Sequence, residues 1–227
     1  RSAGVSEEEL IKIAVKSMGL DELAPFDPQR KIIEYNIAQD DPAAAKKLVR
    51  KDLRAFANEA ASESVAPGGG SISAYVGALG VSLATMVANL SSHKRGWDER
   101  WDEFSEAAER GQRLKDALLR AVDEDTDAFN AIMAAFGLPK GTPEEKAARK
   151  AAIQQATRGA IEVPLRVVRW GLESFPLIRQ MVDTGNPNSI TDAGVGALCA
   201  RAAVLGAALN VKVNAVDLED KDYAAKV

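Results

Sequence analysis

One carboxylate lies on the apolar side of the longest periodic stretch of the sequence. Asp125 falls between Val122 and Phe129 on the same side of a predicted helix, whereas Asp123 and Asp127 point about 160° away. A carboxyl group aimed into a helical bundle is desolvated unless it is paired or hydrogen-bonded, and desolvation raises its pKa. A raised pKa suits a group that gives and takes protons near neutral pH. Asp125 is therefore the candidate acid–base residue.

A structural role for Asp125 is the alternative. The same side chain could be hydrogen-bonded to a nearby backbone group, or it could pair with Arg158 or Arg166. The residues alone leave both roles open.

Three consecutive glycines, Gly68, Gly69 and Gly70, precede Ser71 and the uncharged stretch 71–90. Glycine loses more backbone entropy on ordering than any other residue. The run therefore indicates either a backbone conformation closed to L-residues or a group that approaches the main chain closely. Free N–H groups and the positive dipole end at the start of the following helix favour an anion there. A tight turn into a core helix, without a ligand, is the alternative.

Other polar residues lie near predicted helix ends. Asn89 is near the end of the apolar stretch, and Asn210 and Asn214 follow a second small-residue helix. Neutral amides can recognise a heterocycle by its donors and acceptors, although asparagine at a helix end often serves only as a cap. Three basic residues, Lys94, Arg95 and Lys140, also lie at predicted helix ends. Asp192 is expected to cap the last helix, and Glu162 to bond backbone groups freed at the Pro164 kink.

The composition excludes several classes of function. The net charge is −4 with both signs mixed throughout, so nothing in the sequence suggests nucleic-acid binding. His93 is the only histidine and Cys199 the only cysteine, which excludes multi-histidine zinc sites and argues against a cysteine-based metal site. A lone cysteine is typical of a reducing compartment. With no signal peptide recognised, we expect a cytoplasmic protein without a metal site.

Helical periodicity runs through the whole sequence, and no segment shows sustained period-two alternation. Capping signals include Ser6 with Glu9 and Thr142 with Glu145, and Pro164 is expected to kink or interrupt its helix. The predicted helices span residues 6–18, 29–39, 43–64, 71–90, 97–136, 142–182 and 192–209. The predicted fold class is all-α, an antiparallel bundle of long helices around a central buried Gly/Ala-rich helix.

The stretch 71–90 is also long enough to span a bilayer. It is rich in alanine and glycine rather than leucine, and it lacks an aromatic belt. The second small-residue helix, 192–209, offers it a partner for backbone-to-backbone packing. We therefore expect a core helix and no membrane span.

Several motifs occur together and in order over residues 50–220. They are Pro67-Gly-Gly-Gly-Ser71, Gly77-Ala-Leu-Gly80, Met86-Val-Ala-Asn-Leu90, Asp125-x-x-Ala-Phe129, Leu138-Pro-Lys140, Gly185-Asn186, Thr191-Asp192-Ala-Gly194 and Asn210-Val-x-x-Asn214. In these the sequence resembles the cyclodeaminase/cyclohydrolase family. That family includes the formimidoyltetrahydrofolate cyclodeaminase domain of formiminotransferase-cyclodeaminase and stand-alone methenyltetrahydrofolate cyclohydrolases.

The N-terminal residues carry a second resemblance. Pro25-Phe-Asp-Pro28 and Ile32-Ile-Glu-Tyr35 resemble the junction that follows the formiminotransferase domain in the bifunctional enzyme. We therefore divide the chain into residues 1–42, N-terminal helices and linker, and residues 43–227, a helical cyclodeaminase domain. Because the chain starts at Arg1 rather than Met, we expect residues upstream of it. The junction favours cyclodeaminase over cyclohydrolase.

The resemblance implies a reaction and a site. It implies ring closure of formimidoyltetrahydrofolate to 5,10-methenyltetrahydrofolate with release of ammonia, with Asp125 as the catalytic acid–base residue and without a metal or organic cofactor. His93 departs from the family pattern, which expects a smaller residue there. The predicted substrate-binding residues are Gly68, Gly69, Gly70, Ser71, Asn89, Lys94, Lys140, Asn186, Asp192 and Asn210.

The resemblance also implies partners. We expect a folate substrate that can carry a polyglutamate tail, a homodimer or larger homo-oligomer with sites near the interface, and a formiminotransferase domain in the same protein. Two alternatives stay open: a methenyltetrahydrofolate cyclohydrolase, and a non-catalytic helical oligomerisation module.

Overall fold

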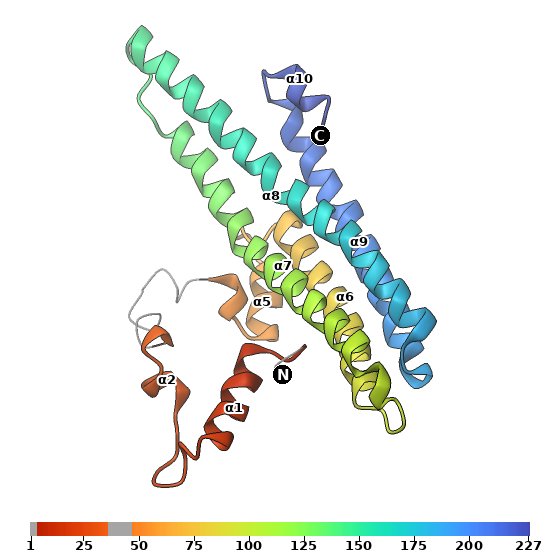
Figure 1. The fold of residues 1–227 in the computed structure, drawn as a ribbon. Coiled ribbons are helices and arrows are strands. Elements are labelled where there is room, and N and C mark those ends of the chain that lie inside the picture. The colour runs from red at the N-terminus through yellow and green to blue at the C-terminus, as the bar shows by residue number, and fades with distance from the viewer. Residues whose placement is uncertain (1–3, 36–46) are drawn as a thin grey trace.

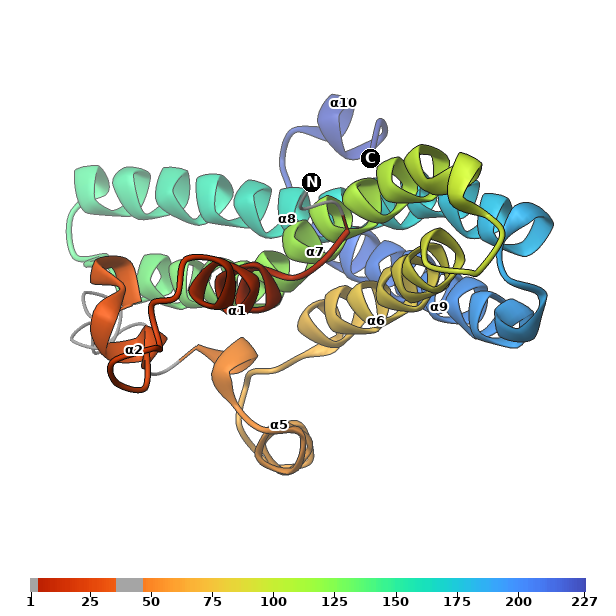
Figure 2. The same ribbon diagram turned by 60° about the horizontal axis from the view of Figure 1, so that its bottom comes forward.

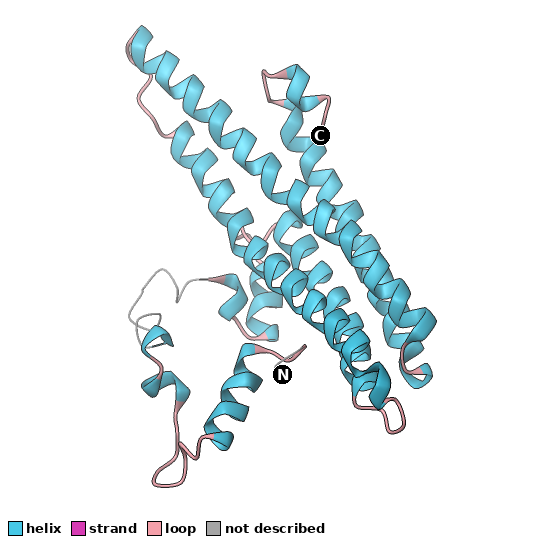
Figure 3. Ribbon diagram, in the orientation of Figure 1, coloured by secondary structure: helices cyan, strands magenta, loops and turns pink. Residues whose placement is uncertain are grey.

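The computed structural model describes residues 4–35 and 47–227, and within these residues the chain is helical without a strand (Figure 3). Four long helices form a bundle: α6 (Gly69–Ser92), α7 (Trp101–Phe136), α8 (Pro143–Thr184) and α9 (Ile190–Val216). Consecutive helices run antiparallel, so the α6–α7 and α8–α9 turns lie at the same end (Figure 1). The predicted all-α fold class is confirmed.

Helix α6 is the central helix, packed against α7, α8 and α9. Its contact with α9 is made by glycines. A Cβ atom built on Gly80 would lie 2.8 Å from the carbonyl oxygen of Gly196, and one on Gly196 would lie 2.8 Å from the carbonyl oxygen of Gly80. Such distances exclude any side chain, so the two small-residue helices pack backbone to backbone as predicted.

Two helical segments are long and apolar enough to cross a membrane: α6 itself and residues Pro187–Val216, which include α9. In the relevant windows, 61% of α6 is buried inside the protein against 28% of the second segment. The apolar character of α6 is therefore explained by its central position, whereas α9 keeps an apolar side that the described residues do not cover.

Helix α8 begins as predicted and continues further than predicted. Thr142 and Glu145 form a capping box, and the helix then runs unbroken through Pro164 and Pro176 to Thr184. Pro164 has no N–H to bond the carbonyl of Ala160. The Asn214 side chain supplies the missing donor, because its Nδ2 lies 2.9 Å from the Ala160 oxygen. Glu162, expected to compensate the proline, instead accepts a hydrogen bond from the Tyr223 hydroxyl of α10 (Lys221–Ala224).

Helix α9 is longer than predicted, and this corrects the placement of two asparagines. The helix extends to Val216, so Asn210 and Asn214 lie within it rather than beyond its end. Val211 is buried against Ile161 and Leu218, and this apolar contact carries the helix past the expected stop.

The N-terminal part is more broken than the sequence indicated. Helix α1 (Glu7–Ser17) begins after Ser6 as predicted. The predicted helix 29–39 is interrupted at Ile32: α2 (Pro28–Lys31) ends there, residues 33–35 are helical again, and the last predicted residues lie outside the described range.

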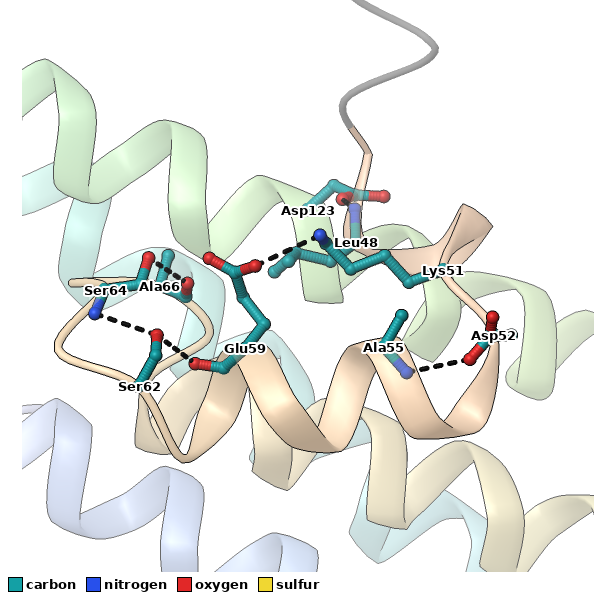
Figure 4. Close-up of polar contacts among 9 residues, drawn as sticks. All are labelled: Leu48, Lys51, Asp52, Ala55, Glu59, Ser62, Ser64, Ala66 and Asp123. Atoms are coloured by element: carbon teal, nitrogen blue, oxygen red, sulfur yellow. Dashed lines mark hydrogen bonds and ion pairs between the residues drawn. The ribbon is translucent and has the colours of Figure 1, made fainter.

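The predicted helix 43–64 is wrong in its described part. A 3₁₀ turn (Leu48–Arg50) is followed by the separate helix α5 (Leu53–Ala60), because the Asp52 side chain accepts the N–H of Ala55 at 2.7 Å and starts a new helix (Figure 4). Figure 2 shows α5 at the periphery of the four-helix bundle, which it contacts through the Phe56 ring, whose centre lies 5.2 Å from that of the Tyr75 ring in α6.

Candidate active site

The first turn of α6 holds the carboxyl group of Asp125. The backbone N–H of Ser71 donates to Asp125 Oδ2 at 2.8 Å, and Ser71 Oγ lies 2.9 Å from the same oxygen and 3.0 Å from the carbonyl oxygen of Val122. The sequence predicted an anion at this helix start, and the anion is supplied by the protein itself. Among the described residues, no hydrogen bond ends on Oδ1 of Asp125, which leaves that oxygen available to a ligand.

The reason for the glycine run is visible at Gly70. A Cβ atom on this residue would lie 2.1 Å from Asp125 Oδ1 and 2.6 Å from its carboxyl carbon. The carboxyl group therefore sits directly against the main chain, as only glycine permits. A Cβ atom on Gly69 would lie 3.2 Å from the Asn210 amide nitrogen, whereas a Cβ atom on Gly68 would have no neighbour closer than 3.9 Å.

The three glycines do not need unusual backbone angles. The glycines with positive φ in the described residues are Gly4, Gly19 and Gly96. Of the two readings of the glycine run, close approach by another group is therefore the one that the structure supports, and the approaching group is the Asp125 carboxyl.

Burial raises the pKa of the Asp125 carboxyl above its ordinary value, and the hydrogen bonds from the Ser71 side chain and backbone oppose that rise. Asp125 is half-buried rather than sealed. A carboxyl group that is held in place, partly desolvated and open on one oxygen has the properties of an acid–base catalyst.

A cleft of about 140 Å³ opens beside this carboxyl group. It is bounded by the glycine turn, by α7 and by the last turns of α9. Its lining residues are Val65, Ala66, Gly68, Gly69, Gly70, Asp125, Thr126, Phe129, Ile132, Ala160, Asn210 and Asn214. The cleft combines apolar walls with a few polar groups, as ligand sites do.

The amides of Asn210 and Asn214 have a defined orientation in this cleft. Asn210 Nδ2 donates to the Gly206 carbonyl at 2.9 Å and Asn214 Nδ2 to the Ala160 carbonyl at 2.9 Å. A carbonyl acceptor requires the amide nitrogen, so each side-chain oxygen remains an acceptor for another group. The Thr126 hydroxyl is buried and has no hydrogen-bond partner among the described residues.

Thr126 and Asn214 line the cleft but were not among the predicted site residues. The Thr126 hydroxyl gave no sequence signal, since threonine beside a catalytic residue is unremarkable. Asn214 stands four residues after Asn210, which in a helix means the same face, so a longer predicted α9 would have paired the two.

Several predicted substrate-binding residues lie at the other end of α6. Asn89 is 18 positions after Ser71 on one helix, which corresponds to about 27 Å along the axis at 1.5 Å per residue. Asn186 lies at the same end, where its backbone N–H donates to Ser91 Oγ at 2.8 Å, and Asp192 is in the first turn of α9 there. Lys94 lies just beyond the end of α6, with its Nζ 4.0 Å from the centre of the Trp97 ring.

Within one chain the predicted residues thus form two groups. Gly68, Gly69, Gly70, Ser71 and Asn210 lie with Asp125. Lys140 is exposed on the turn between α7 and α8, at the tip of the hairpin that these two helices form (Figure 1), and it does not line the cleft. The second group, Asn89, Lys94, Asn186 and Asp192, can reach the cleft only if another copy of the chain supplies it.

Metal-binding side chains do not cluster in the part of the chain that the structure describes. Residues 4–35 and 47–227 contain no cluster of three or more His, Cys, Asp or Glu side chains that could hold a metal ion.

The bundle and the partly desolvated carboxyl group of Asp125 define an α-helical protein with a candidate acid–base site at the start of its central helix. Comparison with known families identifies that class further. Residues 52–227 match the formiminotransferase-cyclodeaminase family and residues 1–38 match the formiminotransferase domain. The chain belongs to the formiminotransferase-cyclodeaminase family.

Individual relatives agree with this assignment. The chain is 36% identical over 222 residues to a formimidoyltransferase-cyclodeaminase of Rattus norvegicus, covering 98% of this chain and 41% of that protein. It is 41% identical over 172 residues to a methenyltetrahydrofolate cyclohydrolase of Methylorubrum extorquens, covering 76% and 83%. The chain thus spans about two fifths of the length of the bifunctional relative.

A solved structure shares the fold. The crystal structure of formiminotetrahydrofolate cyclodeaminase from Thermotoga maritima superposes with a TM-score of 0.70 at 26% sequence identity, covering 79% of this chain and 86% of that one.

Proposed function

We propose that the protein is a formimidoyltetrahydrofolate cyclodeaminase, which closes the formimidoyl group into 5,10-methenyltetrahydrofolate and releases ammonia. The observation that carries the proposal is the Asp125 carboxyl, fixed by Ser71 through Oδ2 and open at Oδ1 in a cleft. The names of the relatives and of the structural neighbour supply the substrate class.

The reaction needs proton transfers rather than a strong nucleophile. One folate nitrogen carries the formimidoyl carbon, and the neighbouring nitrogen attacks that carbon and must lose a proton. The amine on the resulting tetrahedral carbon must gain a proton before it departs as ammonia and leaves the methenyl bridge. Both nitrogens are already within one molecule, so binding supplies the proximity.

Asp125 can serve both transfers in turn. Its ionised Oδ1 accepts the proton of the attacking nitrogen, and the neutral carboxyl then returns that proton to the departing amine. The raised pKa makes the neutral form accessible, and the Ser71 bonds to Oδ2 hold the group in one position throughout. No organic cofactor or metal takes part in this proposal.

The polar groups around Asp125 suit the rest of a folate. The acceptor oxygens of Asn210 and Asn214 and the buried Thr126 hydroxyl can bind the hydrogen-bonding edge of a heterocycle. Lys140, on the projecting α7–α8 turn, is placed to attract the carboxylates of a glutamate tail that leaves the cleft.

A matched pair of variants tests the proposal. Asp125→Asn keeps the size of the side chain and removes the titrating group, whereas Asp127→Asn makes the same change on the exposed side of α7. We expect Asp125→Asn to slow formation of the methenyl product, followed by its absorbance, by about 10²–10⁴-fold. Asp127→Asn should stay within about twofold. Equal rates in the two variants, with folding and folate binding intact, would remove Asp125 from the mechanism.

Methenyltetrahydrofolate cyclohydrolase is the second candidate, because one relative carries that name and matches most of its own length. The match of residues 1–38 to the formiminotransferase domain favours the cyclodeaminase. The same absorbance separates the two, since a cyclodeaminase forms the methenyl product and a cyclohydrolase consumes it.

The cleft of one chain is small for a folate. Its volume of about 140 Å³ is below the roughly 300–1,000 Å³ usual for ligand sites. The α6 and α9 helices also leave large apolar side chains exposed: Leu79, Met86, Leu90, Val195, Leu198, Leu205, Leu209, Val213 and Val216. We therefore propose a homodimer through this face, in which the Lys94 end of one copy completes the cleft of the other.

Mixing inactive variants tests the shared site. If Asp125→Asn and Lys94→Met lesions lie in different copies of one site, heterodimers regain one intact site each, and full exchange restores about a quarter of the wild-type sites. Mixing Asp125→Asn with Gly70→Ala is the control, because both lesions affect the same copy's part of the site. Recovery in the control mixture, or none in the first, would contradict the shared site.

The cellular role also belongs to the proposal. We place the protein in cytoplasmic one-carbon metabolism, in the degradation of histidine, where the reaction would return the formimidoyl carbon to the folate pool.

A further inference from the structure

The N-terminal segment is attached to the bundle through the backbone of one glycine. The carbonyl oxygen of Gly4 accepts hydrogen bonds from Asn89 Nδ2 at 2.7 Å and from Gln112 Nε2 at 2.9 Å. One donor comes from α6 and the other from α7, and Gly4 itself is buried between them.

This position accepts only glycine, for two separate reasons. The φ angle of Gly4 is +75°, a conformation that L-residues rarely adopt. A Cβ atom there would also lie 2.2 Å from the Cβ of Ala108 and 2.6 Å from Asn89 Oδ1. The contact is therefore fitted to one residue type.

The donor at Gln112 is fixed in orientation. Lys115 Nζ donates to Gln112 Oε1 at 2.7 Å, so the amide nitrogen must face Gly4. A neutral amide held in this way by a charged neighbour is a built contact rather than a surface side chain that happens to touch the segment.

A second attachment lies on the same face of α7. Asp123 Oδ1 accepts the backbone N–H of Leu48 at 2.6 Å (Figure 4). Gln112 and Asp123 are eleven residues apart, which is about 20° more than three full helical turns. One side of α7 thus offers a donor to a backbone carbonyl at residue 4 and an acceptor to a backbone N–H at residue 48.

We propose that Asn89, Gln112 and Asp123 form a docking clamp for the N-terminal segment of this chain, and that the clamp sets where the transferase side of the protein sits on the cyclodeaminase bundle. Its occupants are the backbone groups of Gly4 and Leu48, and residues 1–38 match the formiminotransferase domain. The clamp binds the carbonyl of residue 4 and the N–H of residue 48, and it has no room for a side chain at residue 4. The proposal does not depend on which reaction Asp125 catalyses.

Hydrogen exchange on the full chain tests the clamp. Gln112→Glu preserves shape and the Lys115 contact but replaces the donor by an oxygen that repels the Gly4 carbonyl. We expect amide exchange over residues 5–17 to become at least about fivefold faster, the factor that matches one lost hydrogen bond. Exchange in α8 and α9 should not change.

Gln154→Glu is the matched control. Gln154 Nε2 also donates to a backbone carbonyl, that of Asp217, at 3.1 Å, but it ties down the C-terminal segment instead. The same substitution should therefore leave residues 5–17 unaffected and speed exchange around residues 217–224.

Alanine substitutions at two glycines with positive φ separate the effect of steric overlap from that of backbone strain. Gly4→Ala meets both obstacles described above, whereas Gly96 has φ +83° and nothing within 4 Å of a Cβ atom. We expect Gly4→Ala to release residues 5–17 as Gln112→Glu does, and Gly96→Ala to have no effect on them. Unchanged exchange in Gln112→Glu, or faster exchange spread equally over α8 and α9, would overturn the clamp.

Discussion

The two ends of α6 use similar polar residues for different purposes. At its C-terminal end, Asn89 bonds Gly4, Ser91 bonds Asn186 and Lys94 covers the Trp97 ring. At its N-terminal end, Asp125 Oδ1 and the Thr126 hydroxyl lack a hydrogen-bond partner among the described residues.

Within one copy of the chain, the difference separates polar groups that already have a partner from polar groups that are open to a ligand. A buried polar group costs free energy unless it is hydrogen-bonded, so a fold normally provides a partner from its own chain. At the C-terminal end, Asn89 and Ser91 follow this rule. The N-terminal end departs from it beside a cleft, which is what a site that awaits a ligand requires.

Among the substitutions that test the difference between the two ends of α6, those at glycine should change the rate most. Gly70→Ala would place a Cβ 2.1 Å from Asp125 Oδ1 and must displace the carboxyl group, whereas Gly68→Ala meets nothing closer than 3.9 Å. We expect Gly70→Ala to lower kcat by at least about 10²-fold, because a misplacement of about 1 Å at the reacting group costs that much. Gly68→Ala should stay within a few-fold in the same steady-state assay.

Equal losses in the two glycine variants would mean that the turn needs flexibility rather than room for the carboxyl group. The comparison between the two ends would then lose its basis, because no side chain at the N-terminal end would be held for a ligand.

The particular residues show what the sequence could and could not reveal. Asp125 was recognisable because its own helix has a regular apolar stripe, a local property. The partner of its carboxyl group was not, since Ser71 is 54 positions away and meets it only through tertiary packing. The purpose of Gly70 was likewise invisible until α7 was placed beside it.

One consequence of the predicted helix could have been drawn from the sequence alone. Residues 71–90 were predicted as a single helix, and the rise of 1.5 Å per residue already separates Ser71 from Asn89 by about 27 Å. Both residues were assigned to substrate binding, and at that distance they can share a site only between two copies of the chain. The broken helix 43–64 has a different origin. Asp52 caps a new helix, and the hydrogen bond from Leu48 to Asp123, 75 positions away, holds the preceding turn, which the local pattern does not show.

Removing the Ser71 hydroxyl tests how the start of α6 sets the pKa of the Asp125 carboxyl. The hydrogen bond from the Ser71 side chain lowers the pKa of Asp125 against the effect of burial. In Ser71→Ala that opposition is lost, the pKa rises further, and the ionised form needed to accept the first proton becomes scarcer. We expect the acidic limb of the pH profile of kcat to move to higher pH, with a loss of about tenfold or less at neutral pH.

Ser73→Ala is the control for this change. Ser73 is buried two residues further along α6, and its hydroxyl donates to the Gly69 carbonyl at 2.7 Å instead of Asp125. Its pH profile should match the wild type, and a shift of the same size in both variants would assign the effect to the helix rather than to the carboxyl group.

The smallest expected effect concerns stability. Because burial raises the pKa of Asp125 in the folded protein, the native state binds this proton more tightly than the unfolded state does. The ionised carboxyl therefore destabilises the fold at neutral pH, and this cost disappears as the pH falls through the folded pKa towards the ordinary value of 3.8. Asp125→Asn should thus be more stable than the wild type at pH 7 by about 1 kcal/mol, with the difference shrinking towards acid pH. Urea unfolding across the pH range measures it, with Asp127→Asn as the reference. A variant less stable than the wild type at neutral pH would show that the hydrogen bonds from Ser71 stabilise the ionised carboxyl more than burial destabilises it. The Asp125 carboxyl would then be as fully paired within the protein as Asn89 is.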